Sequence, residues 1–167
     1  MYGNGTMIFR ISQRLGKKIK VTPQGVLPNH ENPFADWSAR LFTADRAQYV
    51  IISNTRSLYS IVMHGQGITD DNVFIDRTLS AMRDFMKSDG FQFQHERFIV
   101  PETHTVMFSG NTNRPVIGSM NDLIFQAKIG LIEGGISPHK ASEEINDTLL
   151  SALNYNNPKE AFGAMKL

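Results

Sequence analysis

The sequence predicts a single α+β domain, in which a mainly antiparallel sheet of about five or six strands packs against two main helices and short C-terminal helices. Three strand-like segments, residues 37–43, 48–53 and 58–64, follow one another with connections of hairpin length. Two longer segments, residues 70–88 and 119–133, instead repeat their apolar residues at helical spacing. A chain of 167 residues, 41% of them hydrophobic, is long enough to bury one core.

The chain before these segments contributes a first strand and a long loop. Residues 1–6 are expected to be a flexible extension, and residues 7–167 to form the domain. Residues 7–11 alternate as a strand and lead into a short helical turn capped by Ser12. Residues 21–33 contain three prolines, which favours a loop over the surface.

The two main helices have recognisable beginnings. Thr69 is placed to cap the first helix, which Gly90 ends. Ser119 and Asp122 form an S-x-x-D capping box that is expected to begin the second helix. Only three charged residues lie from Ser119 to Glu133, so we expect this helix to be covered on most sides.

The remaining segments complete the predicted sheet and add short helices. Residues 97–100 and 105–109 are expected to be strands, separated by a break at Pro101. Ser137 and Pro138 are typical of the start of a third helix, and residues 157–165 are expected to form a last short one. Residues 48–53 are apolar on both faces, which favours a central strand covered on both sides.

Composition excludes several classes of function. The chain has 17 Lys and Arg against 16 Asp and Glu, and a net charge of +1 argues against strong non-specific nucleic-acid binding. The absence of cysteine excludes disulfides, thiolate catalysis and cysteine-ligated zinc, and fits a reducing compartment. No apolar run reaches the length of a membrane span, and no apolar signal core begins the chain. We therefore expect a cytoplasmic protein that does not enter a membrane.

Catalytic and metal-binding motifs are weak. Residues 64–67 (H-G-Q-G) lack the lysine of a phosphate loop, and no G-x-S-x-G nucleophile elbow occurs. The five histidines have no metal-site spacing, although His95 with Glu96 and Glu102 with His104 could meet across a hairpin and bind a divalent ion. The prediction is that the protein uses no metal and no cofactor.

The best candidate site is the polar turn that leads into the second main helix. The arginine of this turn and the backbone N–H groups at a helix start together favour an anion. The alternative is structural, because Asp122 repels anions and could pair with Arg114 to lock the turn. The candidate ligand-binding residues are Asn113, Arg114, Ser119, Asn121, Asp122, Asp36, Trp37 and Arg40.

Three blocks of sequence carry a resemblance to a known family. They read M-I-F-R-I-S-Q-R-L from Met7, F-A-D-W-S-A-R-L from Phe34 and N-R-P-V-I-G-S-M-N-D-L from Asn113. Together they resemble an uncharacterised bacterial family that is known only as a domain of unknown function. This resemblance implies a small cytoplasmic protein found on plasmids or gene cassettes, and it implies no activity, cofactor or catalytic residue.

These observations favour a non-catalytic binding or interaction module associated with mobile genetic elements. The alternative is an enzyme that acts on a phosphate-bearing or nucleotide substrate near Arg114, with Asp36 or Asp122 as its acid-base group. Expected partners are a second copy of the chain, a protein partner or a small anionic ligand. A homodimer is expected because both sides of residues 48–53 and 58–64, and most of the helix from Ser119, are apolar.

Overall fold

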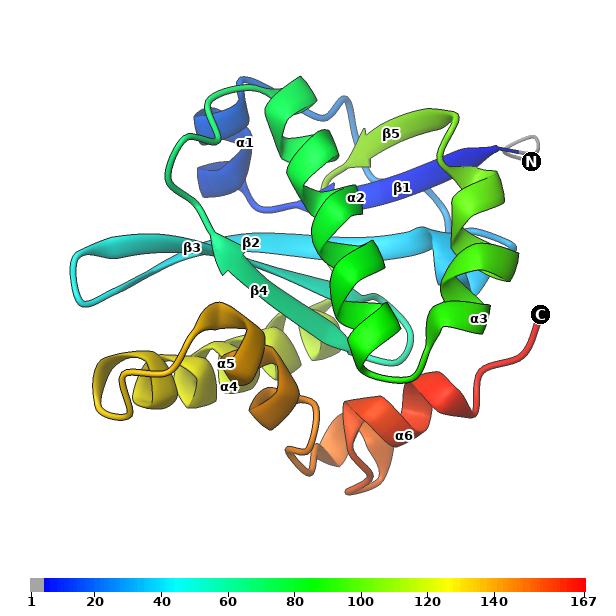
Figure 1. Ribbon diagram of the computed structural model, residues 1–167. Coiled ribbons are helices and arrows are strands. Elements are labelled where there is room, and N and C mark those ends of the chain that lie inside the picture. The colour runs from blue at the N-terminus through cyan, green and yellow to red at the C-terminus, as the bar shows by residue number, and fades with distance from the viewer. Residues whose placement is uncertain (1–4) are drawn as a thin grey trace.

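The computed structural model describes residues 5–167, which form a five-stranded sheet with helices on both faces (Figure 1). The strands are β1 (Thr6–Ile11), β2 (Asp36–Ala44), β3 (Ala47–Asn54), β4 (Ser60–His64) and β5 (Thr105–Ser109). The helices are α1 (Gln13–Ile19), α2 (Asp71–Ser88), α3 (Gln92–Gln94), α4 (Arg114–Ile132), α5 (Pro138–Ile145) and α6 (Pro158–Gly163). Single 3-10 turns lie at Pro33–Ala35, Val100–Glu102 and Ser151–Leu153.

The α+β class is confirmed, whereas the expectation of a mainly antiparallel sheet is wrong. The strand order is β4-β3-β2-β1-β5, and β1 runs parallel to both of its neighbours. Only the hairpins that join β2, β3 and β4 are antiparallel, as their short connections predict. β1 is joined to β2 through residues 12–35, a connection long enough to return the chain in the same direction. The sheet is therefore mixed.

Two predicted boundaries need correction. Thr6 is already part of β1, while residues 1–4 of the predicted extension lie outside the described residues. The strand expected at residues 97–100 is helical instead, as a π-helical turn, His95–Ile99, that continues into a 3-10 turn. This turn buries Ile99 and stacks Phe98 on Phe34, with ring centroids 4.6 Å apart. The packing of Phe98 and Ile99 against buried apolar side chains therefore overrides the strand pattern of residues 97–100.

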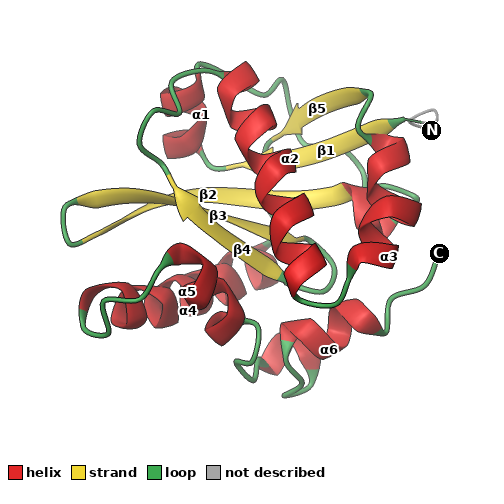
Figure 2. Cartoon of the chain, in the orientation of Figure 1, coloured by secondary structure: helices red, strands yellow, loops and turns green. Residues whose placement is uncertain are grey.

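Alternate side chains of the same strands supply two separate hydrophobic clusters. Figure 2 shows the helices that lie over the strands. On one face, side chains such as Phe9, Leu41 and Val50 pack with residues of α1, α2 and α6. On the other face, Phe42 and Ile51 pack with α4 and α5. β3 is thus covered on both sides, as expected for residues 48–53. Across residues 5–167, the helices are all too short or too polar to cross a membrane.

Candidate functional site

Three adjoining hollows form what we call the polar groove, which runs beside the loop of residues 21–30. Their volumes are about 560, 410 and 290 Å³. Val26, Asn111 and Thr112 line both the first and the second hollow, and Asn29, Thr55 and Asn113 line both the second and the third. The shared lining residues make the three hollows one continuous groove.

The position of the groove follows from the sheet topology. β1 leads to β2 on one side, while β5 lies against its other side, so the connections after β1 and β5 diverge. Such a divergence leaves a crevice at the carboxyl ends of parallel strands, which is where open α/β sheets bind ligands. Ser12 and residues 110–112, which follow these two strands, line the largest hollow together with residues of α1 and most of residues 21–26.

A buried ion pair between Arg10 and Asp36 forms the floor of the groove. Arg10 Nε donates to Asp36 Oδ1 and Nη2 to Oδ2, both at 2.8 Å, and the two residues are 4% and 5% exposed. The remaining guanidinium N–H groups donate to Leu27 O at 2.6 Å, Pro28 O at 2.9 Å and Ser109 Oγ at 3.4 Å. All five donors of the guanidinium therefore have acceptors, and the pair attaches the loop to the sheet.

His30 holds the same loop from the other side of Asp36. Its backbone N–H donates to Asp36 Oδ2 at 3.1 Å, and its Nδ1 accepts from Asn32 N at 2.9 Å. Because Nδ1 accepts a hydrogen bond, the ring proton lies on Nε2, which is 2.7 Å from Thr6 O. Both ring nitrogens of His30 are thus engaged in holding the loop.

Small polar side chains connect the loop after β5 to the rest of the groove wall. The Asn111 side chain donates to Ser38 Oγ at 3.3 Å and accepts from Asn113 N at 3.1 Å. Ser38 Oγ in turn lies 2.9 Å from Thr55 Oγ1. This chain of neutral amides and hydroxyls fixes the segment before α4.

The start of α4 differs from the prediction. Asn113, not Ser119, is the N-cap, and its side chain accepts from Val116 N at 3.2 Å. Pro115 fits the first turn because it needs no hydrogen-bond acceptor there. Ser119 is a buried residue of the helix interior, so the predicted S-x-x-D capping box is wrong. The S-x-x-D pattern competes with an Asn-x-Pro start at Asn113, six residues earlier, and the helix begins at the earlier signal.

The predicted site residues separate into two groups. Asp36 and Asn113 line the groove, and Arg114 is exposed at the first position of α4 beside it. Arg40 is half-buried, on the same side of β2 as Asp36. Trp37 points to the opposite face of the sheet, where it is fully buried and its Nε1 donates to Phe34 O at 2.7 Å.

The residues predicted farther along α4 do not reach the groove wall. Asn121 and Asp122 are exposed on α4, and Asp122 lies about 12 Å along the helix axis from Arg114. Among the ion pairs of residues 5–167, none joins Arg114 to Asp122. Groove residues that the sequence did not indicate include Arg10, Asn29, His30, Thr55 and Arg56.

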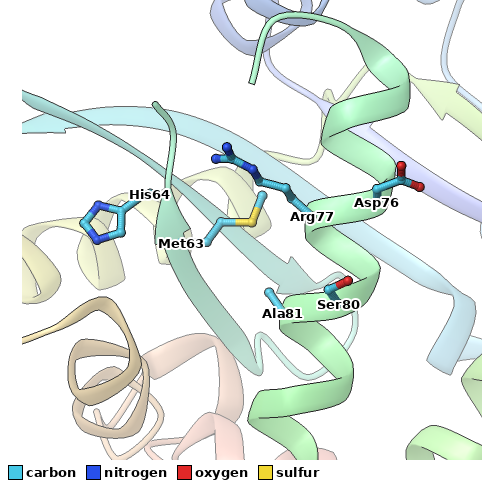
Figure 3. A pocket seen from close by; sticks show the side chains of 6 residues that line it. All are labelled: Met63, His64, Asp76, Arg77, Ser80 and Ala81. Carbon is cyan, nitrogen blue, oxygen red and sulfur yellow. The ribbon is translucent and has the colours of Figure 1, made fainter. Parts of the chain in front are cut away.

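A separate hollow, between β4 and α2, has a histidine, an aspartate and a serine in its lining, which are residue types found in catalytic sites (Figure 3). Figure 3 shows that His64 points away from α2, whereas Asp76 and Ser80 project from α2 without pointing toward His64. The His64 ring lies 5.3 Å from the Tyr49 ring, and Arg77 donates to Gln66 O. These side chains do not converge on a common point, so this hollow offers no acid-base constellation.

The strongest perturbation of a pKa also lies outside the groove. Burial of Tyr59, together with the hydrogen bond that its hydroxyl donates to Asp89 at 2.7 Å, raises the pKa of the phenol well above its ordinary value. Burial lowers the pKa of His95. Within residues 5–167, no group of three or more His, Asp or Glu side chains is arranged to hold a metal ion.

Comparison with known proteins places these residues inside one family domain. The model of a family described as a domain of unknown function (DUF6933) matches residues 8–161, which include every residue of the polar groove. This match agrees with the resemblance of the sequence blocks to a family without an assigned activity. No curated protein and no solved structure matches the chain.

Proposed function

Because the chain belongs to the family described as a domain of unknown function (DUF6933), we propose its function from its own geometry: it is a non-catalytic module that binds a small anionic ligand in the polar groove. The sequence blocks around Asp36 and Arg114 add to this proposal a role as an accessory factor of bacterial mobile elements. The expected cytoplasmic location stays a prediction.

The charge of the groove supports an anionic ligand. Lys17 lines the largest hollow and Arg56 the smallest, and both side chains are exposed. Among residues 5–167, neither has an ion-pair partner. The charges of Arg10 and Asp36 cancel in their ion pair, so the lining has a net positive charge. Amides and hydroxyls between the two cations provide neutral donors and acceptors for the rest of a ligand.

The buried ion pair supports binding without catalysis. Asp36, the acid-base group of the enzyme alternative, accepts two hydrogen bonds from Arg10 and one from the backbone of His30. Both oxygens of this carboxylate are occupied by these donors, and a reaction at Asp36 would have to break a buried, charge-assisted contact. Asp122, the other acid-base candidate, is exposed two turns along α4 and does not line the groove.

Titration with pyrophosphate, followed by backbone amide NMR shifts, tests this function. We expect saturable shifts at Thr55, Arg56 and Asn111, and Arg56→Ala should weaken binding about tenfold or more, which is typical of losing a charged hydrogen bond. Arg83→Ala is the matched control, since Arg83 is an exposed arginine of α2 that lies outside the groove and pairs with its neighbour Asp84. Equal losses in both variants would show non-specific attraction and contradict the groove site.

The same samples separate the binding module from the enzyme alternative. Incubation with nucleoside triphosphates, followed by phosphorus NMR, should show unchanged nucleotides. Release of phosphate that Asp36→Asn or Asp122→Asn abolishes would favour the enzyme and contradict the non-catalytic proposal.

A further inference from the structure

The available positive charges of the polar groove lie at its two ends. Lys17 lines the largest hollow and Arg56 the smallest, and these two hollows have no lining residue in common. The hollow of about 410 Å³ lies between them, because it shares lining residues with each. Among residues 5–167, the only ionisable residue that lines this middle hollow is Arg10, whose guanidinium donors are all occupied. A cation at each end is therefore separated by a stretch without an available charge.

This separation of the two cations selects an elongated ligand. A compact anion such as pyrophosphate occupies one end of the groove, whereas a ligand that contacts both Lys17 and Arg56 must extend through the middle hollow. Such a ligand needs an anionic group at each end and a neutral part between them. Phosphate monoesters suit the two ends, because each has a charge of about −1.5 to −2 at neutral pH. Arginine also binds phosphate oxygens through the two arms of its guanidinium.

The middle hollow offers hydrogen-bonding groups to the neutral part of the ligand. Asn29 lines it where it meets the smallest hollow, and Thr112 where it meets the largest. Both residues are exposed, and neither side chain has a hydrogen-bond partner among residues 5–167. Asn111 and Thr55, by contrast, already use their side chains within the wall. A free amide and a free hydroxyl each donate and accept hydrogen bonds, as the hydroxyl groups of a sugar require.

The lining of the groove favours a sugar over a nucleobase. None of the Phe, Tyr and Trp residues within 5–167 lines any of the three hollows, so a base has no aromatic ring on which to stack. Building on the proposed anion-binding function, we propose that the ligand of the groove is a sugar bisphosphate. Lys17 binds one phosphate and Arg56 the other, while Asn29 and Thr112 bind hydroxyl groups of the sugar between them.

Isothermal titration calorimetry with fructose 1,6-bisphosphate, and with its 1- and 6-monophosphates, tests whether both ends are used. The bisphosphate should bind about tenfold more tightly than either monophosphate, because it adds a second charged contact. Lys17→Ala and Arg56→Ala should each weaken bisphosphate binding about tenfold. A monophosphate can use either end, so neither variant should weaken its binding as much. Lys87→Ala and Arg83→Ala are the matched controls, since both residues are exposed in α2 and lie outside the groove.

Thr112→Val tests the contact with the sugar, because it removes the hydroxyl and keeps the branched shape of the side chain. It should weaken bisphosphate binding about twofold to tenfold and leave pyrophosphate binding unchanged. Equal affinities for the bisphosphate and the monophosphates, or a loss at only one of the two cations, would overturn the proposal. Pyrophosphate shifts in the groove would then still support the anion-binding function. If none of these phosphates binds, both the sugar bisphosphate and the anion-binding function are wrong.

Discussion

Arg10 joins three parts of the molecule that are far apart in the sequence. Its guanidinium pairs with Asp36 at the start of β2, binds the backbone of Leu27 and Pro28, and reaches Ser109 at the end of β5. A buried ion pair of this kind adds little net stability by itself, because desolvation offsets the attraction. Removing one partner is costly, because the other charge then remains buried without compensation.

The ion pair can be measured by a double-mutant cycle. We expect Arg10→Met and Asp36→Asn each to lower the free energy of unfolding by about 3–5 kcal/mol. The double variant should lose less than the sum of the two, because it leaves no unpaired buried charge. Urea unfolding of the four proteins measures these values. Additive losses would mean that the contacts of Arg10 with the loop, rather than the pair, stabilise the floor of the groove.

Tyr59 predicts a specific loss of stability at alkaline pH. Its pKa is raised in the folded protein, so the stabilisation is complete below the unfolded value near 10 and declines as the pH rises above it. The advantage of the unmodified protein over Tyr59→Phe should shrink by about 1.4 kcal/mol per pH unit above about pH 10. Urea unfolding from about pH 9 to pH 11 measures this difference. A constant difference would mean that Tyr59 ionises freely in the folded state.

Single residues of the site were predictable only where a local pattern exposes them. Asp36 and Asn113 stand beside a lone tryptophan and a proline turn, and both patterns point to them. Arg10 lies in an otherwise apolar strand, and the sequence pattern alone would place such a single charged residue on the exposed side of the sheet. Asn29 and Thr55 come from separate connections, and only the folded chain brings them to one wall.

At the scale of elements, α4 shows how two start signals compete. The Asn-x-Pro start at Asn113 and the S-x-x-D pattern at Ser119 both fit general rules, and a helix has one beginning. The helix begins at the earlier signal because Val116 and Met120 are then buried in the cluster that contains Phe42 and Ile51. A boundary is therefore decided by packing that the local pattern does not contain.

The helix start is tested by comparing two substitutions. Asn113→Ala should lower the free energy of unfolding by about 1 kcal/mol, because Val116 N loses its side-chain acceptor. Ser119→Ala should change it by less than about 0.5 kcal/mol, because alanine is the better helix former in a helix interior. Thermal or urea unfolding measures both. The reverse order of losses would restore Ser119 as the cap and contradict the observed start of α4.

At the scale of the whole molecule, local patterns predict the elements better than their pairing. Short connections predict the hairpins of β2, β3 and β4, and the two apolar faces of β3 predict cover on both sides. The direction of β1 relative to β2 and β5 depends on long connections, whose path is set by the packing of the finished fold. The groove could not be predicted from local patterns for the same reason, because the groove lies where these long connections diverge.

Because the same strands supply side chains to both hydrophobic clusters, we predict that residues 7–167 unfold as one unit. That these residues form a single domain is still a prediction. Leu41 and Phe42, neighbours in β2, belong to different core clusters, so neither helical layer can lose its support without exposing the other. Trp37, the one tryptophan, reports on the first cluster, and the circular dichroism signal of α4 includes the second. Urea curves from the two probes should superimpose, as in two-state unfolding. Loss of helix signal at lower urea, with unchanged Trp37 fluorescence, would show that the α4 and α5 layer separates first and that the sheet does not couple the two cores.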